Sequence, residues 1–95
     1  MSSEISALEE LKGRCLAISV EYLDTGIRMR PAIECFTKHL GEAVKRPLIP
    51  EEVQELAEEI MSLREYLKLI QKKYPEVTKD FKPTIEVCNW LLDKP

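Results

Sequence analysis

The sequence predicts an all-α protein whose helices form an antiparallel up-down four-helix bundle. Its apolar residues recur at alternating spacings of three and four, which places them on one face of a helix that turns once per about 3.6 residues. No segment alternates with the period of two that marks a half-buried strand. Prolines and glycines divide the chain into four such amphipathic segments with short connections. Short connections favour antiparallel neighbours.

The clearest helix is predicted at residues 50–74. Pro50 suits the first helical turn, where its missing N–H has no partner to lose, and Pro75 ends the segment. Seven apolar side chains form one uninterrupted stripe along it, and this stripe must be covered by other helices. Its members are Val53, Leu56, Ile60, Leu63, Leu67, Ile70 and Tyr74.

The other helices are predicted at residues 3–23, 31–45 and 83–93. Gly26 is suited to the left-handed conformation that follows a helix end, and Pro31 and Pro83 are each expected in a first turn. The predicted core-facing residues of these helices are Leu8, Leu11, Cys15, Ile18 and Tyr22, then Ile33, Phe36, Leu40 and Ala43, and finally Ile85, Cys88 and Leu92.

Composition indicates one folded domain covering residues 1–95. The chain is 44% hydrophobic and 33% charged, with a net charge of -3, which is too apolar for a disordered segment. No apolar run approaches the roughly 20 residues that span a bilayer, so we expect no membrane association. The start of the chain lacks the features of a signal peptide, and three cysteines suggest reduced thiols. We therefore expect a cytoplasmic protein.

Catalytic signatures are missing from the sequence. It contains no phosphate-binding glycine loop, no metalloprotease motif and no serine nucleophile motif, so we expect no enzymatic activity and no cofactor. The best metal-ligand pair is Cys35 with His39, the only histidine, because residues four apart share a helical face. Cys15 and Cys88 lie at core-facing positions, where cysteine acts as a small hydrophobic residue. Since only Cys35 and His39 then remain as candidate ligands, we expect no bound metal.

The first helix carries more apolar surface than one contact needs. A second stripe runs beside its core-facing residues, and it consists of Leu16, Val20, Leu23 and Ile27. Such a helix either packs between two neighbours or offers one face to a partner. The second alternative predicts a non-enzymatic interaction module, or adaptor, that binds a partner protein through this stripe. The same stripe could also join two copies of the chain in a homodimer.

The alternative function is binding of nucleic acid or another polyanion. In an up-down bundle the connections after the first and third helices lie at the same end. Basic residues gather there, opposed by Asp24, Glu76 and Asp80. Phosphates attract such residues, although lysines also suit the C-terminal end of any helix. The basic residues are Arg28, Arg30, Lys72, Lys73, Lys79 and Lys82.

Overall fold

The protein is an all-α four-helix bundle. The computed structural model describes residues 2–93, with side chains from residue 4 onward. Its long helices are α1 (Ser2–Glu21), α2 (Arg30–Lys45), α3 (Pro50–Lys73) and α4 (Thr78–Leu92). Short 3-10 turns, η1 (Leu23–Thr25) and η2 (Pro75–Val77), follow α1 and α3. No helix in this part of the chain is both long and apolar enough to cross a membrane.

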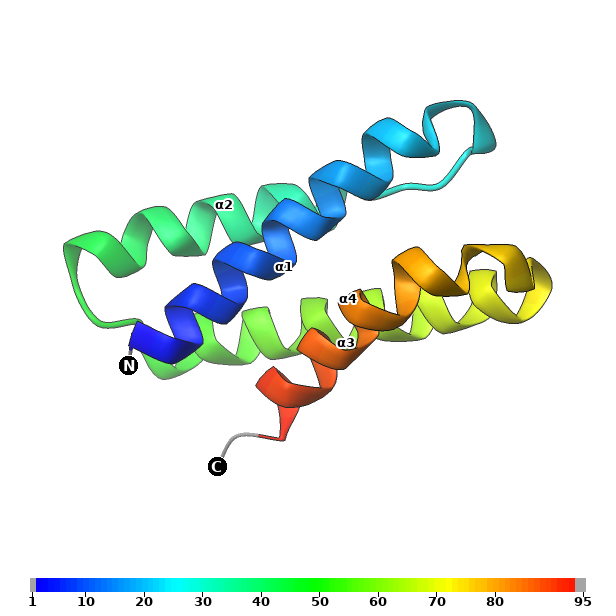
Figure 1. Cartoon of the computed structure of the whole chain (residues 1–95). Coiled ribbons are helices and arrows are strands. Elements are labelled where there is room, and N and C mark those ends of the chain that lie inside the picture. Colours follow the sequence, from blue (N-terminus) through cyan, green and yellow to red (C-terminus); the bar gives the residue numbers. More distant parts are fainter. Residues whose placement is uncertain (1, 94–95) are drawn as a thin grey trace.

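The helices follow one another around the bundle in chain order. Contacts join α1 to α2, α2 to α3, α3 to α4 and α4 back to α1, which is the pattern of an up-down bundle. The α1–α2 and α3–α4 connections lie at one end, and the N-terminal start of α1 and the α2–α3 connection lie at the other (Figure 1). The predicted fold class is therefore confirmed.

The core is built mainly from the predicted stripes. The middle of the α3 stripe is buried from Leu56 to Leu67, and four α1 residues from Leu8 to Ile18 are buried in the same core. The two ends of the α3 stripe, Val53 and Tyr74, are about half exposed. A stripe longer than its neighbours leaves its ends uncovered, so its central turns supply most of the apolar burial.

The start of α4 was predicted wrongly. The helix begins at Thr78, five residues before the predicted start, and Pro83 lies inside it. Proline in a helix removes one backbone hydrogen bond. Burial of Val77 and Phe81 on either side of the first turn offsets this loss, and Asp80 accepts a hydrogen bond from the Tyr22 hydroxyl at 2.5 Å. Tertiary contacts therefore hold a turn helical where proline predicted a boundary.

The core-facing side of α2 is rotated from the prediction. Ala32, Phe36 and His39 are buried, whereas Ile33 and Leu40 are only partly buried. The other predicted boundaries hold to within two residues: α1 ends at Glu21 rather than residue 23, and Gly26 has the expected left-handed conformation, with φ 80°.

Candidate functional site

The second apolar stripe of α1 lies mostly on the surface. Exposed fractions are 43% for Leu16, 75% for Val20 and 78% for Leu23. Ile27 differs, because it is partly buried and packs against the core. The bundle therefore leaves three of the four predicted partner-binding residues uncovered, and the alternative in which two neighbouring helices cover the stripe is not what the structure contains.

A shallow groove between α1 and α2 extends this surface. Leu16 lines it from α1, and Leu40 and Val44 line it from α2. Val44 is 86% exposed. Gly13 and Gly41 form part of the groove wall, and a Cβ atom added at either would meet nothing within 4 Å. The groove is therefore hollow where these two helices carry no side chain.

We call the apolar surface made by these groove residues together with Val20 and Leu23 the α1–α2 face. The α2 half of this face was not predicted from the sequence. Val44 lay beside the predicted core-facing residues of α2, and the rotation of α2 turns it outward. The packing of α2 against α1 brings Val44 into the same groove as Leu16 of α1.

The predicted basic residues surround one end of the bundle. The α1–α2 and α3–α4 connections meet there, as expected, and a hydrogen bond from the backbone N–H of Arg28 to the Tyr66 hydroxyl, 2.7 Å long, ties the first connection to α3 (Figure 1). Arg30 pairs with Glu34 at 2.9 Å. Within residues 4–93, the other five basic side chains form no ion pair.

A cleft of about 640 Å³ opens at this end. Tyrosines 22, 66 and 74 line it together with Ile70 and the exposed Leu69. The Lys73 ammonium lies 5.6 Å from the centre of the Tyr74 ring, a cation–π contact. The hydrogen bond to Asp80 raises the pKa of Tyr22 to about 12, so its phenol stays protonated at neutral pH.

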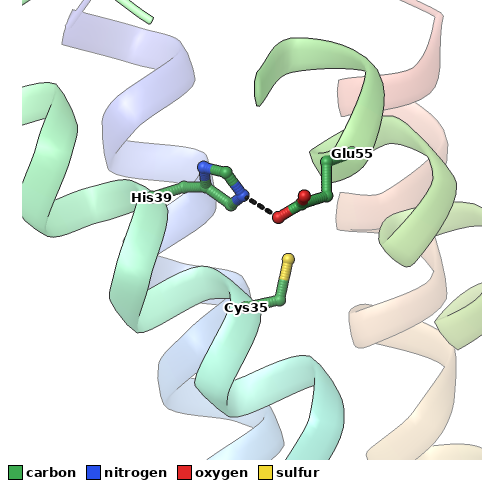
Figure 2. A group of neighbouring side chains, drawn as sticks. All are labelled: Cys35, His39 and Glu55. Carbon is green, nitrogen blue, oxygen red and sulfur yellow. Dashed lines mark hydrogen bonds and ion pairs between the residues drawn. The ribbon is translucent and has the colours of Figure 1, made fainter. Parts of the chain in front are cut away.

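A third cluster lies between α2 and α3. Cys35 and His39 point from α2 towards Glu55 on α3 (Figure 2). One donor atom from each residue lies within 4.8 Å of the others, and His39 Nε2 is 2.7 Å from Glu55 Oε1. Helical spacing predicted the pair Cys35 and His39 but not Glu55, because the approach of Glu55 depends on how α3 packs against α2.

Carboxylates surround this cluster and affect the pKa values of its groups. Burial, together with the carboxylates of Glu59 and Glu55, raises the pKa of the Cys35 thiol to about 11. The hydrogen bond from His39 lowers the pKa of Glu55, and the Lys38 ammonium, 3.5 Å from Glu55 Oε1, lowers it further. The cluster therefore holds a protonated thiol, a buried imidazole and an ionised carboxylate at neutral pH.

The two remaining cysteines are core residues. Cys15 and Cys88 are fully buried, and burial raises the pKa of each thiol to about 12. A thiol that stays protonated in an apolar core is a poor nucleophile.

Comparison of the chain with protein-family models, curated proteins and solved structures found no match.

Proposed function

We propose that the protein is a non-enzymatic interaction module whose α1–α2 face binds an amphipathic helix of a partner protein. The observation that carries this proposal is the exposure of Val20 and Leu23, at 75% and 78%, on the same stripe of α1 as Leu16, which lines an open groove with Leu40 and Val44 of α2. Large apolar side chains exposed next to one another, with polar residues at the margin, are typical of interaction sites.

The shape of the face favours a helix as the bound element. Leu16, Val20 and Leu23 are spaced four and three apart, the spacing with which helices pack against each other. Gly13 and Gly41 leave room for the backbone of a third helix to approach the groove. Glu9 and Lys12 border the groove with charges of opposite sign, which suits a partner helix with both charges along its margins.

The test compares capture of partner proteins by matched variants. Val20→Asp and Leu23→Asp place a carboxylate on the face without disturbing the core, since both side chains are exposed. Leu69→Asp is the control, because Leu69 is 67% exposed but lies on α3, outside the face. Circular dichroism of each variant checks that the bundle remains folded.

The expected result is a defined protein that co-purifies from native lysate with the wild type and with Leu69→Asp, and is lost with Val20→Asp and Leu23→Asp. It should survive nuclease treatment. Equal capture by all four chains would overturn the proposal. Sedimentation of the purified protein tests for self-association. If the wild type is a dimer and Val20→Asp is a monomer, the face binds a second copy of the chain instead of a partner protein.

A second candidate is polyanion binding by the basic end. It is favoured by one observation: five basic side chains there, among them Lys72, Lys79 and Lys82, form no ion pair with any side chain of residues 4–93. Binding to a fluorescent single-stranded oligonucleotide should weaken steeply with added salt. It should be lost in an Arg28→Glu, Lys79→Glu, Lys82→Glu triple variant. If the wild type does not bind the oligonucleotide at low salt, or if the triple variant still binds it, polyanion binding by the basic end is refuted.

A further inference from the structure

We infer that Cys35, His39 and Glu55 form a binding site for one zinc ion, which links α2 to α3. This inference is independent of the partner-binding proposal. The sequence alone predicted no metal, because helical spacing brings together only two ligands, Cys35 and His39.

The donor atoms suit zinc. Zinc in proteins is held by cysteine sulfur, histidine nitrogen and carboxylate oxygen, and this cluster offers one of each. With bonds of about 2.0–2.3 Å, a tetrahedral ion separates its donors by roughly 3.3–3.8 Å. The three donors already lie within 4.8 Å of one another. Binding therefore requires shifts of about an ångström, which rotation of the Glu55 and Cys35 side chains supplies.

The framework around the donors is already ordered. His39 is completely buried, and its Nε2 atom faces Glu55 (Figure 2). Its other ring nitrogen, Nδ1, is buried without a hydrogen-bond partner in the described part of the chain. The imidazole is thus fixed by packing and directs one nitrogen at the carboxylate, so an ion at Nε2 would replace this single hydrogen bond.

The surrounding charges favour a cation. Glu59 follows Glu55 by one helical turn and acts electrostatically on the Cys35 thiol. The cation now nearest to Glu55 is the Lys38 ammonium, on a side chain that is 63% exposed. Such a side chain can turn into solvent, so zinc would replace an ammonium at the same carboxylate.

The fourth position of the ion would face solvent. The Glu55 side chain is 55% exposed, and water can complete the tetrahedron from that side. An ion shared between α2 and α3 would fasten the middle of α2 to the first turns of α3, beyond the 46–49 connection that joins the two helices, and stabilise the bundle.

Cobalt titration tests the site directly, since Co²⁺ bound to a thiolate gives a near-ultraviolet charge-transfer band. The metal-free, reduced wild-type chain should develop this band with one equivalent of Co²⁺, lose it on addition of Zn²⁺, and unfold at a higher temperature with Zn²⁺ present. Cys35→Ser should abolish the band. Glu55→Gln should weaken Zn²⁺ binding by at least about tenfold, the scale on which even outer-shell changes act.

The controls separate this site from others. Glu58→Gln alters an exposed carboxylate on α3 that is not a candidate ligand, and it should leave the titration unchanged. Neither Cys35 nor Glu55 is fully buried, so their variants should keep the helical content of the wild type. Absence of the band in the wild type, its retention in Cys35→Ser, or equal Zn²⁺ affinity in Glu55→Gln would each overturn the inference.

Discussion

The three glycines respond differently to alanine, and this difference tests how open the α1–α2 groove is. Gly13 and Gly41 lie inside helices, are exposed, and have nothing within 4 Å of an added Cβ atom. Gly26 also has open space around it, but its φ is 80°, a conformation that side chains disfavour. Gly13→Ala and Gly41→Ala should therefore stabilise the bundle, whereas Gly26→Ala should destabilise it.

The magnitudes follow from backbone preferences, because no neighbouring atom interferes. In an exposed helix interior, alanine is favoured over glycine by about 0.8–1.0 kcal/mol. For a domain of this length, that gain should raise the melting temperature by about 4–8 °C for each of Gly13→Ala and Gly41→Ala. The left-handed conformation costs a residue with a Cβ atom roughly 1–2 kcal/mol, so Gly26→Ala should lower the melting temperature by a similar or larger amount.

Thermal unfolding followed by circular dichroism at 222 nm measures all three variants. Wild-type chain at the same concentration is the reference, and a second concentration detects any contribution from self-association. If Gly13→Ala or Gly41→Ala lowers the melting temperature, the space beside that glycine is occupied in solution. The reasoning that the groove is open, and with it the proposed docking of a partner helix, would then be refuted.

Two further predictions concern the core and the start of α3. Leu67→Ala, at a fully buried position, should cost about 2–5 kcal/mol of unfolding free energy, whereas Leu69→Ala, at a position 67% exposed, should stay within about 0.5 kcal/mol of the wild type in urea denaturation. Glu52 accepts two hydrogen bonds from Arg46, which lower its pKa from 4.5 to about 2. Because the folded state binds the Glu52 proton less tightly than the unfolded state does, this pairing stabilises the fold above pH 4.5 and is lost as the pH falls towards 2. Glu52→Gln should therefore lower the urea midpoint at pH 7 and reduce its further fall between pH 5 and pH 2; an acid-induced fall as large as that of the wild type would contradict the assignment.

The middle of each helix could be predicted from sequence because local spacing determines it. The α3 stripe from Leu56 to Leu67 is buried as predicted, since an apolar face of this length must be covered. The start of α4 could not be predicted in the same way. Proline at position 83 suggested a boundary, whereas the preceding turn is helical because Val77 and Phe81 are buried and Asp80 accepts a hydrogen bond from Tyr22.

The candidate sites depend more strongly on tertiary structure. The sequence predicted an extra apolar stripe on α1, but the spacing was also compatible with burial between two neighbouring helices. The packing of the helices leaves Val20 and Leu23 exposed, whereas Ile27 is partly buried against the core. Packing also rotated α2, which turned Val44 outward into the groove that it lines together with Leu16.

The cluster of Cys35, His39 and Glu55 illustrates the same division. Helical spacing alone placed Cys35 and His39 on one face, because residues four apart lie one turn apart. Glu55 belongs to the next helix, and its distance from His39 depends on the rotation and relative height of α2 and α3. The sequence by itself therefore determined the helices and most of their buried faces, which follow from local periodicity. The tertiary structure decided which surplus apolar residues remain exposed and which polar side chains meet, because both depend on contacts between helices.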